Sequence, residues 1–246
     1  MSKTFDQLSA VLDYMNCTHE EEGDENGCEE STVPTRMGKL TAIVGAMGGG
    51  KTTRLLEEAQ ICEEQGLRYL IIKSTTDRRR IDPVTQLLSS RGEDNWEDSE
   101  GAIWTHDGRQ APCLTVDSLG QLPSDIHRLI DVLLVDEMHF LNDDAPFCIN
   151  SFLEKGVSVM VACLRTDYQA RPFPPSSWLM SHGTVIQKDP DCNICHAQNE
   201  GIYTDRIVQT VKETIVCGGL DDYRPLCRTC YKKACPTFYA AMLECE

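Results

Sequence analysis

The chain lacks two features that would place it at a membrane or on a nucleic acid. It has no apolar run of about 20 residues, the length that a membrane-spanning helix needs, and no basic-then-apolar leader. It also has little positive charge, since 23 Lys and Arg oppose 39 Asp and Glu and the formal net charge is −16. A protein that binds the nucleic-acid backbone needs a basic face. We therefore expect a cytoplasmic protein with no membrane partner and no direct nucleic-acid partner.

Cysteine, by contrast, is abundant, with 13 in 246 residues. Without a secretion signal, these cysteines are expected to be reduced thiols or metal ligands rather than disulfides. Two C-x-x-C pairs lie in the last quarter of the chain, and each can supply two thiolates to a tetrahedral zinc ion. The predicted zinc ligands are Cys192, Cys195, Cys227 and Cys230.

Other interpretations of these two pairs stay open at this point. They are a redox pair, buried free thiols, or a zinc site in which Cys217, Cys235 or Cys245 replaces one ligand. A zinc site with four cysteines leaves no position for water, so its role would be structural. It would hold together a segment too small to fold by its own core.

A glycine-rich loop carries the first chemical motif. Residues 45–52 read GAMGGGKT and fit G-x-x-x-x-G-K-[ST]. The glycines let backbone N–H groups surround phosphate oxygens, and the lysine reaches the same oxygens. An expected strand at 39–44 precedes the loop, and an expected helix at 53–65 adds its positive dipole end. The predicted ATP-binding residues here are Gly45, Ala46, Met47, Gly48, Gly49, Gly50, Lys51, Thr52 and Thr53.

The second chemical motif is an apolar strand that ends in Asp136 and Glu137. Asp136 is expected to complete the ATP site by holding Mg²⁺ opposite the Thr52 hydroxyl, so both residues are predicted Mg²⁺ ligands. A carboxylate at Glu137 can orient a water in an ATPase, or accept the proton of an attacking hydroxyl in a kinase of small alcohols. The motif alone leaves both acceptors open.

The intervening sequence predicts an α/β fold. Short apolar runs suit strands that are buried on both faces of a parallel sheet, and helical stretches such as 145–155 fall between them. These runs are 68–73, 113–116, 131–135 and 157–163. We expect a P-loop NTPase-like parallel sheet flanked by helices, with a small zinc-bound C-terminal domain. The polar stretch 86–105 is interpreted as an inserted loop.

Taken in order along the chain, these and several further motifs resemble the thymidine kinase family of the cytosolic and bacterial type. That family joins a P-loop domain to a zinc-bound lasso domain. The resemblance runs from about residue 37 to about residue 233. Its segments are 45–47, 72–79, 105–107, 136–140, 162–173, 192–195, 203–206 and 218–231.

The resemblance implies an activity and roles for individual residues. The acceptor would be the 5′-hydroxyl of thymidine, which ATP and Mg²⁺ convert to dTMP for nucleotide salvage. Glu137 matches the family's general base, and Lys51 and Arg79 match groups that act on the transferred phosphate. Residues matched to the nucleoside site are Met47, Phe140, Leu164, Tyr168, Thr204 and Tyr223. A lasso held by zinc would close over the base, and the family further implies a homotetramer and feedback inhibition by dTTP.

Three departures from the family pattern surround the expected nucleoside site. Gly48-Gly49 stands where the family usually has Phe-Ser, His139 where it has Gln, and Arg165 where it commonly has Asp. Deoxyuridine or a pyrimidine nucleoside modified at carbon 5 is therefore an alternative substrate. Two readings from other classes are a zinc-containing P-loop ATPase that binds nucleic acid and a non-catalytic nucleotide sensor.

Four regions are predicted from these observations. Residues 1–36 are expected to form an acidic, disordered N-terminal extension, because they hold many carboxylates and little apolar surface. Residues 37–188 form the P-loop kinase domain and 189–233 the zinc and lasso domain. Residues 234–246 form a C-terminal tail.

Overall fold

A computed structural model describes residues 36–74, 102–105, 108–207 and 222–243. The N-terminal extension, Arg79 and most of the 86–105 insertion lie outside these residues. So do Cys217 and Cys245, and the predictions that concern them remain predictions.

The centre of the molecule is a six-stranded sheet in which every neighbouring pair is parallel. Its order is β5-β2-β6-β7-β1-β8. The bounds are β1 (Leu40–Gly45), β2 (Tyr69–Ser74), β5 (Leu114–Val116), β6 (Val132–Asp136), β7 (Ser158–Leu164) and β8 (Thr184–Gln187). The five strands expected from the sequence are confirmed within two residues. Strand β8 was not expected.

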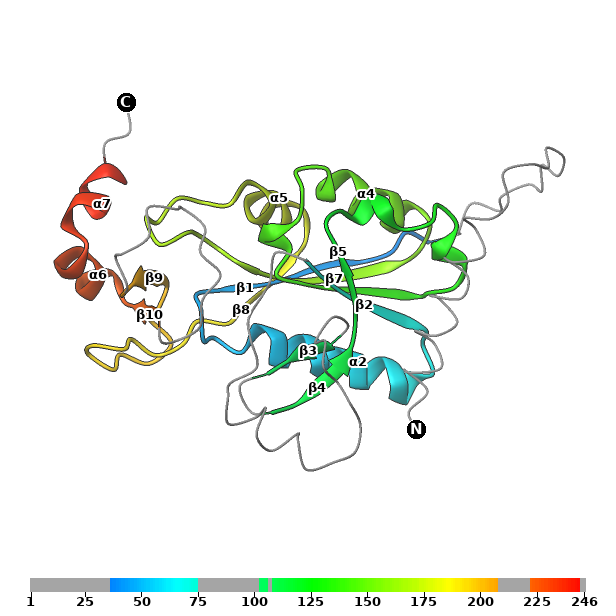
Figure 1. Cartoon of the computed structure of the whole chain (residues 1–246), viewed down its shortest axis with the longest axis horizontal. Coiled ribbons are helices and arrows are strands. Elements are labelled where there is room, and N and C mark those ends of the chain that lie inside the picture. The colour runs from blue at the N-terminus through cyan, green and yellow to red at the C-terminus, as the bar shows by residue number, and fades with distance from the viewer. Residues whose placement is uncertain (1–35, 75–101, 106–107, 208–221, 244–246) are drawn as a thin grey trace, which may run out of the picture.

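Helices cover both faces of the sheet (Figure 1). Helix α2 (Lys51–Gln65) packs on one face, where Leu55 and Cys62 join Ile43 of β1 in a buried cluster. Helices α4 (Ala145–Glu154) and α5 (Pro174–His182) cover the other face, where Ile149 and Leu179 join a second cluster. Leu40, Ala42 and Val44 of β1 belong to the second cluster and Ile43 to the first, as expected for a strand buried on both faces.

Short elements complete the sheet domain. Strands β3 (Ala102–Trp104) and β4 (Gln110–Pro112) form an antiparallel pair, through which Ile103 reaches the α2 cluster. Three short 3-10 helices follow: η1 (Leu119–Gln121), η2 (Ile126–Arg128) and η3 (Met138–Phe140). Among the described residues, no helix has the length and apolar character to cross a membrane.

The cysteine module, residues 192–206 and 222–241, lies beyond the carboxyl edge of the sheet (Figure 1). It contains the antiparallel pair β9 (Tyr203–Arg206) and β10 (Tyr223–Leu226), followed by α6 (Arg228–Ala234) and α7 (Pro236–Ala241). Its buried cluster is small: Cys192, Tyr203, Leu226, Cys227, Cys230 and Tyr231. The predicted α/β class with a small cysteine-rich appendage is confirmed, while the exact domain boundaries remain a prediction.

Candidate active site at the carboxyl edge of the sheet

The glycine-rich loop connects β1 to α2 at the carboxyl edge, and Lys51 is the first residue of the helix. Its side chain is directed back into the loop, and Nζ donates a hydrogen bond of 2.8 Å to the Ala46 carbonyl. Lys51 is only 7% exposed. A buried ammonium is costly unless it has polar partners, so its position here is that of a group kept ready for an anion.

Gly49 and Gly50 are among the loop glycines that its geometry requires. Gly50 precedes α2 with φ of +75°, a conformation that residues with a Cβ rarely adopt. A Cβ on Gly49 would lie 1.9 Å from the carbonyl oxygen of Lys188, which follows β8. A serine at position 49 would therefore force the 188 segment away from the loop. Glycine at position 49, where the family usually has serine, therefore allows a close contact between the loop and Lys188, in the segment that leads to the cysteine module.

The two predicted Mg²⁺ ligands lie together. The Thr52 hydroxyl is 3.1 Å and 3.3 Å from the two carboxylate oxygens of Asp136, the last residue of β6. A hydroxyl and a carboxylate are ligands of the kind that Mg²⁺ prefers. The pair therefore fits a Mg²⁺ ion that binds together with nucleotide phosphates.

Glu137 follows Asp136 and has an unusual backbone. Its φ and ψ are 51° and 41°, in the left-handed region, and it caps η3. A non-glycine residue in this region costs free energy and persists only where the surrounding structure imposes it. Glu137 is also 7% exposed. The fold thus holds a carboxylate in a strained turn, one residue after the predicted metal ligand.

His139, which the sequence analysis noted only as a departure, contacts Glu137. Its Nε2 lies 3.2 Å from Oε2 of Glu137. Its Nδ1 accepts a hydrogen bond of 3.2 Å from the backbone N–H of Leu164, at the end of β7. The His139 side chain therefore links the carboxylate of Glu137, the predicted base, to the backbone of Leu164, a predicted nucleoside residue.

The other predicted nucleoside residues divide into two groups. Met47 and Phe140 are half-buried and lie on the loop and on η3, at the carboxyl edge with Leu164. Tyr168 lies against the cysteine module: the Arg206 guanidinium is 4.2 Å from the centre of its ring, and the Tyr231 hydroxyl donates to its carbonyl at 2.7 Å. Among the described residues, the rings of Tyr168 and Phe140 do not contact each other.

Thr204 and Tyr223 belong to the cysteine module, on β9 and β10. Thr204 is 3% exposed, and its buried hydroxyl has no hydrogen-bond partner in the described structure. Buried hydroxyls are nearly always hydrogen-bonded, so an exception calls for an explanation. A hydrogen bond to a polar group of a ligand would be such an explanation, and it suits the predicted role of Thr204.

The C-terminal helix α7, predicted only as part of a tail, packs near Tyr168. The ring of Phe238 meets that of Tyr168 edge-on, with centroids 5.7 Å apart. Both rings line a cavity of about 430 Å³, whose other lining residues are Asp205, Arg206, Ala234, Cys235, Pro236 and Thr237.

The four predicted zinc ligands, Cys192, Cys195, Cys227 and Cys230, form one cluster. Their sulfur atoms lie within 4.8 Å of one another, and those of Cys195 and Cys227 are 3.6 Å apart. Four sulfurs at the usual zinc distance of about 2.3 Å would be about 3.8 Å apart, so the cluster fits a zinc ion. Cys235 is not part of it, because its thiol donates to Asp205 at 3.1 Å.

The electrostatics of the cluster also suit a cation. Burial opposes ionisation of Cys192, but nearby backbone N–H groups lower the pKa of its thiol to about 6. Burial and the three neighbouring thiols raise the pKa of Cys230 to about 12. Close thiolates repel one another, so all four can ionise together only with a cation among them.

Comparison with known proteins now bears on this site. A family model described as "Thymidine kinase" matches residues 86–231, more than half of the chain. A thymidine kinase of Pseudothermotoga lettingae is 30% identical over 197 residues, which cover 80% of this chain and 96% of that protein. The chain belongs to the thymidine kinase family.

Other members of the family are similar over the same extent. A thymidine kinase of Oryza sativa subsp. japonica is 29% identical over 83% of this chain and 70% of its own length. A solved DNA replication initiation factor overlaps with a TM-score of 0.35 and 11% identity, over 78% of this chain and 48% of its own, and this weak likeness carries no functional argument. The predicted resemblance to the thymidine kinase family is confirmed.

Within this thymidine kinase family member, sequence reasoning missed two contacts of the site. The first is the approach of Lys188 to the loop, which depends on the unexpected strand β8. The second is the path from Glu137 through His139 to Leu164. The only sequence signal for the second was that His139 departs from the family pattern.

Proposed function

We propose that this protein transfers the γ-phosphate of ATP to the 5′-hydroxyl of thymidine, giving dTMP and ADP, with Mg²⁺ as cofactor. The observation that carries the proposal is the position of Glu137. This buried carboxylate is held in a left-handed turn directly after Asp136, at the same sheet edge as the phosphate-binding loop. Such a carboxylate can take a proton from a nucleophile that attacks a phosphate bound at the loop.

In the proposed reaction, loop N–H groups and Lys51 bind the β- and γ-phosphate oxygens. Thr52 and Asp136 would hold Mg²⁺, which would neutralise charge on the phosphates. The 5′-oxygen forms a bond to the γ-phosphorus as the bond from that phosphorus to the β,γ-bridging oxygen breaks. Glu137 accepts the hydroxyl proton, and ADP keeps the bridging oxygen. Arg79, which lies outside the described residues, is proposed to act on the transferred phosphate.

The proposed acceptor is thymidine because the chain's relatives are named thymidine kinases and because polar and aromatic groups suit a nucleoside. The buried Thr204 hydroxyl would bond a polar group of the base. Met47, Phe140, Leu164, Tyr168 and Tyr223 would pack around the base and sugar. Deoxyuridine or a pyrimidine modified at carbon 5 is the alternative, since Gly49, His139 and Arg165 depart from the family near this site.

A structural zinc ion on the four-cysteine cluster would support recognition of the base. It would hold together the ends of the module whose strands β9 and β10 carry Thr204 and Tyr223. A rigid module closed over the substrate would exclude water, which keeps the phosphate from being transferred to it. The family resemblance further predicts that the protein is cytoplasmic, that it forms a homotetramer and that dTTP inhibits it.

The test is transfer of ³²P from γ-labelled ATP, with Mg²⁺, to thymidine, deoxyuridine, deoxycytidine or no added acceptor. We expect labelled dTMP as the main product, with deoxycytidine at least about 10-fold poorer in kcat/KM. Equal turnover of thymidine and deoxycytidine would exclude thymidine specificity. Labelled free phosphate without nucleoside product would mean that water is the acceptor and the protein is an ATPase. Tight ATP binding without any transfer would indicate a sensor.

A further inference from the structure

A chain of buried polar contacts runs from α5 to the candidate base. The Ser176 hydroxyl donates to the Leu164 carbonyl at 2.7 Å, and the Leu164 N–H donates to Nδ1 of His139 at 3.2 Å. On the other side of the imidazole ring, Nε2 lies 3.2 Å from Oε2 of Glu137. The path thus joins α5, the carboxyl end of β7 and the turn after β6.

The Leu164 contact fixes which nitrogen of His139 carries the proton. A nitrogen that accepts an N–H bond has no proton of its own, so Nδ1 is unprotonated. In the neutral ring the proton is then on Nε2, because the bond made by one nitrogen determines the state of the other. The Nε2–H group is the one that faces the Glu137 carboxylate.

Packing prevents the ring from turning away. The His139 side chain has no exposed surface. Its ring lies 4.1 Å from that of Phe140 and 4.9 Å from that of Phe173, tilted by 45° and 44°. A flip of the ring would exchange the two sides and lose the Leu164 hydrogen bond. The aromatic neighbours and the β7 backbone together keep Nε2–H beside Glu137.

We propose that His139 is a positioning residue that orients Glu137 for proton transfer, an inference that rests on the proposed function. Its N–H would hold one carboxylate oxygen, so that the other can be presented to the 5′-hydroxyl of the substrate. Nε2 and Oε2 are 3.2 Å apart in the structure but are not aligned as a hydrogen bond. Catalytic contacts often become aligned only when substrate is bound, and a small rotation of the carboxylate would align this one.

Two substitutions separate this role from a structural one. In His139→Asn, the short amide oxygen reaches the position of Nδ1 and keeps the Leu164 N–H bonded, but no donor reaches Glu137. In His139→Gln, the longer amide nitrogen reaches the position of Nε2 and keeps the donor beside Glu137, while the Leu164 bond is lost. His182→Gln is the matched control, because His182 is exposed on α5 and stacks on Trp178 outside the site.

The measurements are kcat and both KM values for phosphate transfer to thymidine, with thermal unfolding of the same preparations. We expect His139→Asn to lower kcat by about 10- to 100-fold, the effect of losing a hydrogen bond to a charged group, with KM for ATP changed by less than about threefold. His139→Gln should keep kcat within about fivefold of the unmodified protein although it is the less stable of the two variants. His182→Gln should change neither.

Two results would overturn the inference. One is an unchanged kcat in a folded His139→Asn protein. The other is an equal fall of kcat in both variants, or a larger fall in His139→Gln, because activity would then follow the structural bond to Leu164 rather than the donor to Glu137. If the unmodified protein makes no nucleoside product, the proposed function fails first. That outcome is distinct from active protein whose two variants do not differ.

Discussion

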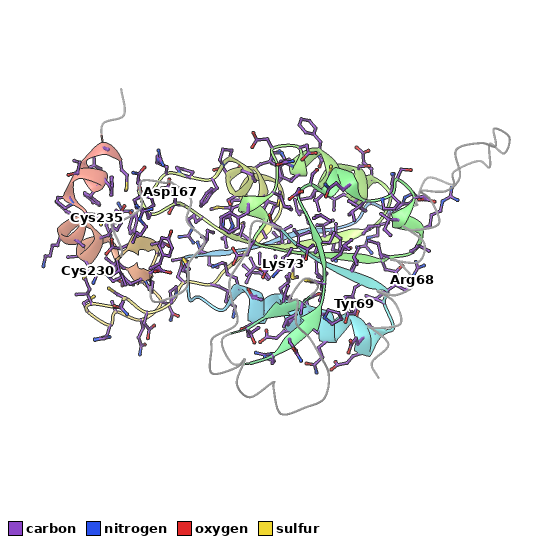
Figure 2. All side chains as sticks on the ribbon, viewed as in Figure 1. Arg68, Tyr69, Lys73, Asp167, Cys230 and Cys235 are labelled. Carbon is purple, nitrogen blue, oxygen red and sulfur yellow. The ribbon has the colours of Figure 1, made fainter. Side chains whose placement is uncertain are left out.

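The two ends of the parallel sheet hold their charged groups in opposite ways. At the amino end, Arg68 and Asp131 precede β2 and β6 and form a fork of hydrogen bonds of 2.8 to 3.1 Å. Their side chains are 48% and 38% exposed. At the carboxyl end, Lys51, Asp136, Glu137 and His139 are each less than 10% exposed. Figure 2 shows Arg68 at one end of the molecule and the module residues Cys230 and Cys235 beyond the other.

The difference indicates what each end is for. Arg68 and Asp131 are hydrogen-bonded to each other and remain in contact with water, so the pair adds a little stability and carries no large desolvation cost. The carboxyl-end groups are buried at a cost, and Glu137 also has a strained backbone. A fold keeps such an arrangement where a ligand repays the cost, so substitutions at the two ends should have opposite effects on activity and stability.

The largest effect is expected at Lys51. Lys51→Met removes the charge that is proposed to contact the phosphates and should lower phosphate transfer by about 10³-fold or more. Stability should be unchanged or higher, because a buried ammonium is removed. Arg68→Met is the matched control and should lower the melting temperature while transfer stays within about twofold. Comparable losses of activity in both variants would contradict the comparison.

The next effect concerns the metal. Removal of zinc by a chelator, or Cys227→Ser, should abolish ordered structure in the cysteine module, which has six residues in its core cluster. Transfer to thymidine should fall by about 100-fold or more, whereas ATP binding to the sheet domain should persist. Metal analysis, calorimetric ATP titration and the transfer assay measure these quantities. Cys235→Ser should keep one zinc per chain, and loss of zinc from it would put Cys235 among the ligands.

A smaller effect is expected at Thr204. Thr204→Val keeps the side-chain shape and removes a buried hydroxyl without a partner, so stability should be equal or higher. KM for thymidine should rise by about 10-fold, since the proposed hydrogen bond from Thr204 to the substrate would be lost. Thr115 of β5 also has a buried hydroxyl without a partner in the described structure, and Thr115→Val should leave KM unchanged. Equal KM values in both variants would remove Thr204 from the substrate site.

The smallest effect belongs to the amino end and depends on pH. Hydrogen bonds from Arg68 lower the pKa of Asp131 below its ordinary 3.8. The unfolded chain therefore binds the proton first as pH falls, and the pair's stability is complete above 3.8 and is lost as pH falls through the folded value. Asp131→Asn should cost less than about 1 kcal/mol at pH 7. In urea unfolding, this difference should shrink below pH 3.8, and a difference that grows there would be contrary to the assigned cause.

Local sequence patterns predicted most of the sheet, the phosphate-binding loop and the four-cysteine cluster. The apolar runs predicted five strands, the loop predicted the start of α2 to within two residues, and the cysteine spacing predicted the four-cysteine cluster. Strand β8 was missed because it is an edge strand with mostly exposed residues and no long apolar run. Helix α5 was not among the expected elements, and its first turn holds Pro174 and Pro175. Prolines in fact suit the first turn of a helix, where no N–H partner is needed.

The contacts that build the site were less accessible to sequence reasoning. Glu137 was predicted as the base, but its left-handed backbone and its contact with His139 depend on how β6 and β7 end side by side. In the same way, the need for glycine at position 49 comes from Lys188, 139 residues later. Pairings of this kind are set by the packed sheet, and no local pattern reports them.

The central claim is that the buried carboxyl-end groups are held for phosphate transfer and not for stability. The most direct measurement is Glu137→Gln, which keeps the size of the side chain and removes the proposed proton acceptor. Transfer of label to thymidine and thermal unfolding are measured on one preparation. We predict that transfer falls by at least about 100-fold while the melting temperature is unchanged or higher. Undiminished transfer, or loss of the fold with the loss of activity, would contradict the account.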